Sequence, residues 1–331
     1  MESSSSRLFG FPTEPPFQLG KSRFPQQTFF GRYLHFLDVI DPTTLFASQK
    51  KLDESVALLE RFKRGERGFA TDGELWQAQK IKQAILHPDT GKRILPPFRM
   101  SGFVPFGWIT VTGMLLPNPS TTTLLFWQWM NQSHNACVNY ANRNASQPQP
   151  VSKFVAAYTV AVTAACSVSL GLSSLLKRFT LLPPSTRLLL SRFVPLPATS
   201  LASSLNVIAM RGGELQSGIA VYEEGGKVVG VSKTAAKRAV FETTATRAFL
   251  PVPLLLLPPC VMPFLERYRW VKSTVPRHIF VQALVCTLSF AFSLPIALAI
   301  FPHESTIPTS SLEPEIQANT KKDKLFFNKG L

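Results

Sequence analysis

The stretch F-V-A-A-Y-T-V-A-V-T-A-A-C-S-V-S-L-G-L-S-S-L-L, residues 154–176, decides the class of fold because it carries no charged side chain. A helix needs roughly 17 to 25 mostly apolar residues to cross a bilayer. Four other blocks come close to that length and composition, at 98–116, 188–210, 248–265 and 279–301. Buried helices of soluble proteins have shorter apolar runs, so the sequence predicts an all-α multispan membrane protein rather than a large soluble helical bundle.

The sequence around these blocks predicts three further parts of the chain. Residues 1–28 are rich in Ser, Pro and Gln and are predicted to be disordered or loosely docked. Residues 29–97 are charged and mixed, and we expect them to form a small soluble helical head. The apolar blocks make 98–301 the transmembrane body, and 302–331 follows as a C-terminal tail.

Helical patterns within the head are predicted at 33–40, 42–63 and 73–86. The second of these has Asp41 as a cap and Pro42 at its first position, where proline is tolerated best. The head should therefore consist of short helices joined by tight turns.

The connection 211–247 differs from the other connections because it is long and rich in glycine, and we expect it to lie outside the membrane. Its β-prone runs at 219–222 and 227–231 are joined by Glu-Glu-Gly-Gly, which predicts a short β-hairpin. A helix is then expected at 234–246.

Prolines are frequent inside the apolar blocks, at positions 105, 195, 197, 251, 253, 258, 259, 263 and 295. Each removes a backbone donor and clashes with the preceding turn, so several spans are predicted to be kinked or broken. Broken helices whose freed carbonyls line a cavity are a recurring feature of secondary transporters.

The segment W-Q-W-M-N-Q-S-H-N-A-C-V-N-Y-A-N-R-N, residues 127–144, places amides within the apolar part of the chain. At about 100° per residue the polar side chains share one helical face. We call this face the amide stripe; its members are Gln128, Asn131, Gln132, Asn135, Asn139, Asn142 and Arg143. The opposite face carries Phe126, Trp129, Met130, Cys137, Tyr140 and Ala141. Because the preceding loop at 117–120 is short and uncharged, 121–140 is a candidate sixth span, which makes the predicted count five to six.

Amides that faced hydrocarbon would cost several kcal/mol each, so the stripe must face other helices, water or a solute. One interpretation is that the amides only bond neighbouring helices together. The other, favoured by so many amides on one face, is that the stripe lines a substrate pathway. A neutral amide wall suits a zwitterion or a hydroxylated acid better than a bare metal ion, which would require carboxylates.

Four arginines are candidate contacts for an anionic solute. Arg143 ends the amide stripe, Arg99 begins the first apolar block, and Arg192 and Arg247 stand at later span entrances. The competing interpretation is that each charged end reaches the membrane interface while its stem stays in the apolar layer.

Composition and motifs exclude several classes of function. The net charge of +15 is scattered, so no nucleic-acid-binding stripe is predicted. His134 and Cys137 alone do not make a metal site, and neither a metal nor a cofactor is predicted. No phosphate loop, dinucleotide fingerprint or nucleophile elbow is present, so no enzyme activity is expected. The predicted partners are a small-molecule substrate and membrane lipids.

His87, Pro88, Asp89 and Thr90 close the last predicted helix of the head. The simpler interpretation is a stop signal, in which Pro88 ends the helix and the next residues turn. H-P-D is also the motif with which J-domains recruit a chaperone ATPase. The chain reaches Pro96 within a few residues, which leaves no room for the helix that a J-domain needs next.

Taken together, these features resemble one family, the sideroflexins, from Phe29 to Leu331. The resemblance rests on Asp41-Pro42, Leu45-Phe46, His87-Pro88-Asp89-Thr90, Phe126-Trp127-Gln128-Trp129, Asn131-Gln132-Ser133, Val138-Asn139-Tyr140, Asn142-Arg143, Arg192-Phe193-Val194-Pro195, Gly218-Ile219, Phe301-Pro302 and Phe327-Asn328-Lys329-Gly330-Leu331. It implies a multispan carrier of the mitochondrial inner membrane that moves a small organic acid or amino acid.

Three runs, at 16–21, 134–137 and 312–316, are most similar to the branch of the family that is associated with citrate. Other branches resemble serine carriers, and one is linked to the assembly of respiratory complexes. A serine or other amino-acid carrier and a non-transporting membrane scaffold are therefore the alternatives. The family's association with iron implies an effect on iron handling, for which this sequence offers no ligand set.

Overall fold

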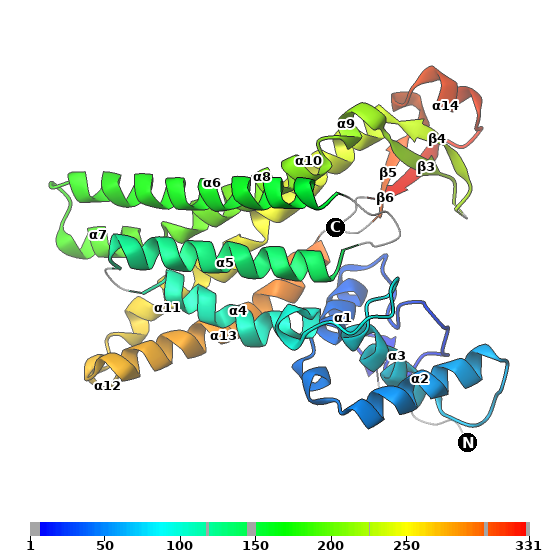
Figure 1. Ribbon diagram of the computed structural model, residues 1–331, viewed down its shortest axis with the longest axis horizontal. Helices are drawn as coiled ribbons and strands as arrows, with labels where there is room; N and C mark the ends of the chain where they lie inside the picture. The colour runs from blue at the N-terminus through cyan, green and yellow to red at the C-terminus, as the bar shows by residue number, and fades with distance from the viewer. Residues whose placement is uncertain (1–6, 117–118, 144–149, 225, 301–303, 329–331) are drawn as a thin grey trace. The chain divides into compact units, whose positions relative to one another are not determined.

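The computed structural model describes residues 7–116, 119–143, 150–224, 226–300 and 304–328 (Figure 1). The chain forms two compact units. Unit 1 consists of Met1–Thr110, His134–Pro148 and Phe290–Ile300. Unit 2 consists of Val111–Ser133, Gln149–Ser289 and Phe301–Leu331. Parts of the predicted motifs at 301–302 and 327–331, and part of the predicted loop at 117–120, fall outside the described residues.

The head in unit 1 contains three helices, α1 (Phe29–Val39), α2 (Gln49–Lys63) and α3 (Asp72–Ile85). Each begins after a hydroxyl residue that accepts a backbone N–H of the first turn; these residues are Thr28, Ser48 and Thr71. The predicted single helix at 42–63 is wrong, because it divides into the 3₁₀ turn η1 (Pro42–Phe46) and α2. Ser48 causes the division by capping α2 in an extended conformation.

The described part of residues 1–28 lies against the head helices. A short hairpin forms from β1 (Arg7–Leu8) and β2 (Phe11–Pro12). Phe17 is buried against Leu59 and Trp76, and its backbone N–H donates to Asp72. The amide of Gln79 bonds the backbone of Gly20 and Lys21, at 2.8 Å each, so this segment is held by side chains of α3.

The first predicted span, at 98–116, is wrong in its extent. Two 3₁₀ turns, η2 (Pro96–Phe98) and η3 (Met100–Gly102), precede the helix α4 (Phe103–Met114). A Cβ atom at Gly102 would stand 2.1 Å from the Pro96 carbonyl oxygen, so the tight turn depends on glycine at this position.

Unit 2 is built on long apolar helices. In α6 (Val151–Arg178) Ala157, Ala161 and Ala165 are buried, and α6 lies along α8 (Pro195–Arg211), as Figure 1 shows. Ala202 of α8 packs into the same alanine cluster. Small side chains allow two helix backbones to approach closely in a membrane, where apolar burial alone gives no driving force.

Within the part of the chain that the structure describes, four helical stretches are long and apolar enough to cross a membrane: Val151–Arg178, Pro184–Arg211, Lys233–Leu265 and Val275–Ile300. The second joins α7 (Pro184–Ser191) to α8, and the third joins α10 (Lys233–Phe249) to α11 (Pro251–Leu265). The fourth is α13 (Val275–Ile300). Neither the twelve-residue α4 nor the amide-rich α5 (Thr121–Ala141) meets the same criterion, so the predicted count of five to six is not confirmed.

Prolines interrupt these helices at fewer places than predicted. Breaks precede Pro195 and Pro251, each of which begins a new helix. The helices α11 and α13 continue through Pro258, Pro259 and Pro263 and through Pro295, so these spans are not broken there. Proline is favourable at the first position of a helix because that N–H has no intrahelical partner.

The predicted hairpin is confirmed as β3 (Ile219–Tyr222) and β4 (Val228–Ser232), which follow the short helix α9 (Glu214–Ser217). Two further strands were missed, β5 (Glu304–Pro308) and β6 (Lys324–Asn328). They join the hairpin in an antiparallel sheet of order β4-β3-β6-β5. The expected tail is therefore part of a folded C-terminal module.

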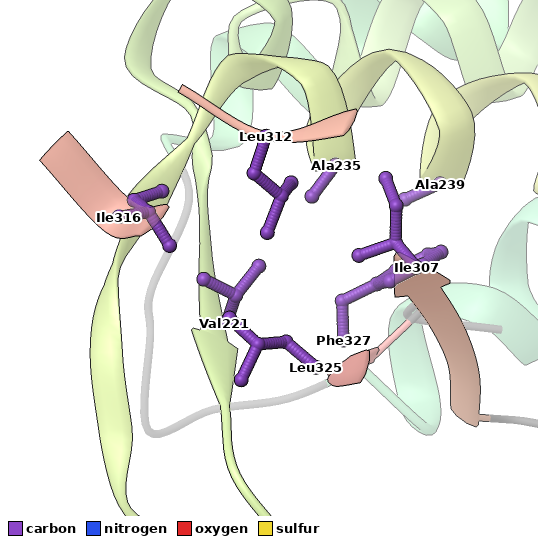
Figure 2. Packing of buried hydrophobic residues seen from close by; sticks show 8 residues of the cluster. All are labelled: Val221, Ala235, Ala239, Ile307, Leu312, Ile316, Leu325 and Phe327. Atoms are coloured by element: carbon purple, nitrogen blue, oxygen red, sulfur yellow. The ribbon is translucent and has the colours of Figure 1, made fainter. Parts of the chain in front are cut away.

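The core of this module combines the sheet with α10, the 3₁₀ turn η4 (Thr309–Ser311) and α14 (Pro314–Ala318). Figure 2 shows its buried side chains pointing toward one another; they are Val221, Ala235, Ala239, Ile307, Leu312, Ile316, Leu325 and Phe327. The hairpin alone would expose one face of its strands, and burial by segments almost 100 residues later in the sequence gives it a core.

Candidate functional site

Helix α5 has its polar face inside and its apolar face outside. Gln128, Asn131 and Gln132 are buried, whereas Phe126, Trp129 and Tyr140 are exposed by 44%, 45% and 40%. This is the reverse of a helix on a soluble protein and fits a helix whose outer face meets lipid. The predicted division of α5 into two faces is thus seen in its middle turns.

Two of the buried amides of α5, Gln128 and Gln132, have polar atoms without a hydrogen-bond partner among the described residues. Gln128 has an exposed fraction of 0%, and neither its Oε1 nor its Nε2 atom has a hydrogen-bond partner among the described residues. The Nε2 atom of Gln132 is likewise buried without one. A buried amide without a partner costs roughly 1 to 3 kcal/mol, so these groups are unusual in a settled structure.

Trp127, the residue before Gln128, packs where several helices of unit 2 converge. One apolar cluster joins Val111, Met114 and Leu115 of α4 or its end to Leu255 of α11 and Cys286 of α13. Trp127 of α5 and Leu196 of α8 pack against it. Other buried polar atoms belong to residues within one helical turn of this cluster: Thr112 Oγ1, Thr199 Oγ1 and Gln282 Oε1. Polar groups from four helices thus border one apolar centre.

An ionic cluster in unit 2 joins the break between α7 and α8 to the end of α11 and the start of α13. Glu266, which follows α11, accepts hydrogen bonds on one oxygen from Arg192 Nη2 at 2.6 Å and from His278 Nε2 at 2.9 Å. Burial would raise the pKa of Glu266, but the hydrogen bonds from His278 and Arg192 outweigh it and hold that pKa below its usual value. Arg192 was predicted as an anion contact, and its charge is already compensated by Glu266.

Two hollows meet at His278. A small cavity of about 10 Å³, room for about one water molecule, is lined by this residue, Arg192, Glu266 and Gln282 among others. An open groove of about 600 Å³ is lined by His278 from its other side, between the starts of α5 and α13. Gln282 lies one turn before Cys286 of the apolar cluster, and its Nε2 donates to the Leu115 carbonyl at 2.7 Å, so α13 connects the groove and the ionic cluster with the apolar cluster.

The C-terminal part of the amide stripe is arranged differently and belongs to unit 1. Asn135 is half-buried, and Asn139 is exposed. Asn142 is exposed, and its Nδ2 donates to the carbonyl oxygens of Phe98 and Val138, both at 2.8 Å. Arg143 is also exposed and lies over the ring of Tyr140, at 3.7 Å from its centroid. These last two side chains are engaged in fastening the end of α5.

His134 serves as a helix contact. Its ring stacks on Phe103 with centroids 5.7 Å apart, and its Nε2 atom lies 3.1 Å from the Pro97 carbonyl oxygen. Among the residues that the structure describes, no group of three or more His, Cys, Asp and Glu side chains is placed to hold a metal ion.

The other two predicted anion contacts have different surroundings. Arg99 is buried in unit 1 with an exposed fraction of 1%; its Nε donates to Ile94, while its Nη2 has no partner in the described part of the chain. Arg247 is half-buried near the end of α10. Arg247, which belongs to unit 2 like the groove at His278, is not among the described residues that line that groove.

The His87–Thr90 run forms a fixed turn. The Nδ1 atom of buried His87 accepts the backbone N–H groups of Asp89 and Thr90, at 3.1 and 3.3 Å. Its Nε2 donates to the carbonyl of Arg143 at 2.8 Å, which requires the proton to be on Nε2. Pro88 supplies the stop, and the imidazole fastens the end of α5, which is a structural role within unit 1.

Sequence reasoning missed Glu266 and Gln282 and placed His278 only at a span end. Glu266 carried the one available signal, as an acidic residue in an otherwise basic connection between the last two apolar blocks. Nothing in the local pattern of 278–282 indicates that its side chains face Arg192, which stands more than 80 residues earlier.

Comparison with known proteins gives a consistent set of relatives. The sideroflexin family matches residues 18–331. A Sideroflexin-5 of Caenorhabditis elegans is 70% identical over 98% of this chain and 98% of its own, and a Sideroflexin-5 of Homo sapiens is 52% identical over 96% and 94%. A Sideroflexin of Dictyostelium discoideum is 40% identical over 96% and 98%. No solved structure matches the chain.

Proposed function

Because the chain belongs to the sideroflexin family, we propose that this multispan membrane protein is a secondary transporter of a small organic acid, citrate above all, in the mitochondrial inner membrane. Within the same class, the alternative is a carrier of serine or another amino acid. From another class, the alternative is a non-transporting scaffold for respiratory-complex assembly. The preference for citrate rests on the resemblance of 16–21, 134–137 and 312–316 to the citrate-associated branch.

The observation that carries the proposal is the burial of Gln128 without a partner. If the stripe served only to bond helices together, its most buried amide would be bonded to a neighbouring helix. Gln128 makes no such bond with a described residue, and neither does the Nε2 atom of Gln132. A solute that moves along this face would supply the hydrogen-bond partners of these amides. This favours a substrate pathway over a role in bonding helices together.

Amides suit the chemistry of such a solute. Each offers two N–H donors and a carbonyl acceptor, so one side chain can bind a carboxylate and a hydroxyl without a charge of its own. A neutral wall also holds an anion less tightly than fixed cations would, and a carrier must release its substrate on the other side. Carboxylates, which a metal-ion pathway would require, are absent from the predicted wall.

The ionic cluster provides a means to couple substrate to helix movement. Arg192 lies in the break between α7 and α8, Glu266 follows α11, and His278 is in the first turn of α13. A substrate carboxylate that replaces Glu266 at Arg192 would release the α11 end from the α8 end. The breaks before Pro195 and Pro251 are then the positions where these helices can swing during alternating access.

The test is uptake by the purified full-length protein in liposomes, with labelled citrate and labelled serine in parallel. The wild type should accumulate citrate faster than serine. Gln128→Leu should reduce uptake more than 10-fold, because it removes both polar atoms from the wall. The matched control is Gln216→Leu, an exposed glutamine of α9 outside the convergent helices, which should retain wild-type uptake.

The rival functions give different outcomes. Uptake of serine without citrate identifies the amino-acid carrier. Absence of uptake for both solutes and for other amino acids, with Gln128→Leu losing recovery of partner proteins from mitochondria, favours the scaffold and refutes transport.

A further inference from the structure

The open groove at the starts of α5 and α13 has a volume of about 600 Å³. Its lining residues all belong to unit 2 and are Leu116, Pro119, Ser120, Thr123, Lys272, Thr274, Val275, His278 and Ile279. A volume of this size is ample for a small organic acid.

The polar part of the lining favours negative charge. Lys272 and His278 stand beside the hydroxyls of Ser120, Thr123 and Thr274, and no acidic residue is among the described lining. Lys272 is exposed and makes no hydrogen bond or ion pair with a described residue. Its charge is therefore available to a ligand, unlike that of Arg192, which Glu266 already neutralises.

Two long helices add to the same field. The described part of the groove includes Ser120 and Thr123 at the start of α5, and Thr274 and Val275 at the start of α13. A helix carries a partial positive charge at its N-terminus, from N–H groups without intrahelical acceptors. Both helices thus reinforce the attraction that Lys272 exerts.

The position of His278 connects the groove with the interior. Its side chain lines the groove and also donates Nε2 to Glu266, which lines the inner cavity together with Gln282. An anion bound beside His278 would compete with Glu266 for the same imidazole. The groove is thus placed where binding can act on the ionic cluster.

We infer that this groove is the entry site at which the substrate first binds, through carboxylates held by Lys272, His278 and the neighbouring hydroxyls. The inference rests on the proposed transport function and adds to it the place of entry and the required chemistry, at least one free carboxylate on the solute. The phosphate of an anionic lipid shares that chemistry, and the experiment separates the two sources.

The experiment measures equilibrium binding of labelled citrate to the full chain in phosphatidylcholine nanodiscs. Lys272→Ala should weaken binding about 3- to 10-fold, as expected for one partly exposed charge-assisted contact. The matched control is Arg269→Ala, an exposed cation of the same short helix α12 (Arg269–Lys272) that does not line the groove, with a change under about 2-fold. Citrate should also slow the labelling of Thr123→Cys by an impermeant thiol reagent, read peptide by peptide.

Equal citrate affinity for Lys272→Ala and the wild type would falsify the entry site, even if liposome uptake is intact. Loss of the Lys272-dependent part of binding when cardiolipin is included in the nanodiscs would assign the groove to lipid and also overturn the inference. Lys272-dependent binding without any uptake would leave the anion site standing and refute the transport function instead. The two proposals therefore fail separately.

Discussion

The two halves of α5 carry the same kind of side chain on one face and use it in opposite ways. In the first half, Gln128 and the Nε2 atom of Gln132 are buried without described partners. Directly after the second half, Asn142 donates to two backbone carbonyls and Arg143 lies over Tyr140. The difference teaches that an amide inside a membrane protein is informative about transport only when its partners are known.

The ionic cluster of unit 2 extends the comparison to charged groups, because all three of its side chains are partnered. We expect side chains with protein partners to stabilise the fold and amides without described partners to bind the solute. The substitutions that reduce stability most should then differ from those that reduce uptake most. The following predictions are arranged by their expected effect on the free energy of unfolding in detergent micelles.

Glu266→Ala should have the largest effect, a loss of about 3 kcal/mol, because it leaves a nearly buried Arg192 without its counter-charge. Denaturant titration measures the loss. The matched control is Arg64→Ala, which breaks an exposed pair with Glu66 and should leave the free energy of unfolding nearly unchanged. Equal effects for the two variants would show that the cluster is no more than a surface ion pair.

Acid should weaken the same cluster. The folded-state pKa of Glu266 lies below its unfolded value of 4.5, so its stabilisation is complete above that value and is lost as the pH falls through the folded pKa. The unfolding midpoint of the wild type should therefore fall more steeply below pH 4.5 than that of Glu266→Gln. Parallel pH profiles for the two proteins would contradict this assignment.

Asn142→Leu should cost about 1 kcal/mol, because it removes hydrogen bonds to the carbonyls of Phe98 and Val138. Asn139→Leu is the control on the same helix, exposed and without a described hydrogen bond, and should change stability by less than about 0.5 kcal/mol. A larger loss for Asn139→Leu than for Asn142→Leu would reverse the distinction within the second half of α5.

Gln128→Leu should have the smallest effect on stability, less than about 0.5 kcal/mol of loss or a slight gain, because an apolar side chain of similar size replaces an amide without partners. The same variant should have the largest effect on uptake. A stability loss of about 2 kcal/mol or more would mean that Gln128 makes a structural bond in the membrane, and the comparison of the two halves would collapse.

Residues of the three runs that resemble the citrate-associated branch, at 16–21, 134–137 and 312–316, make structural contacts in this fold. Leu312 and Ile316 are in the core of the C-terminal module, as Figure 2 shows. Glu313 accepts the backbone N–H groups of Lys233 and Thr234 at the start of α10. Phe17 packs on α3, and His134 stacks on Phe103. We therefore look to other residues for the origin of substrate preference, and the groove at Lys272 is our candidate.

Much of the fold could be predicted because it is written in local patterns. The head helices follow from capping residues and apolar periodicity, and the hairpin follows from β-prone runs around a glycine pair. The predictions that were wrong also have local physical causes. Ser48 capped a new helix within the segment expected at 42–63, and two 3₁₀ turns shortened the first predicted span.

The candidate site was predictable only in part. Helical geometry alone placed Gln128, Asn131 and Gln132 on one face, and that face is buried. Helical geometry could not predict that Asn142 has hydrogen-bond partners whereas Gln128 has none among the described residues. It does not show which backbone carbonyls lie within hydrogen-bond distance. The sequence could not predict either that Glu266, His278 and Gln282 lie near Arg192. Their proximity depends on how the helices that carry them pack together.

The sequence by itself determined the membrane class, the helical head, the hairpin and the one-sided polarity of α5, because each depends on residues within a few turns of one another. The tertiary structure alone decided which amides have partners, where the charges of Arg192, Glu266 and His278 meet, and that β6 completes the sheet with β3. These are contacts between segments tens to more than a hundred residues apart. Their formation depends on packing, which no local pattern records.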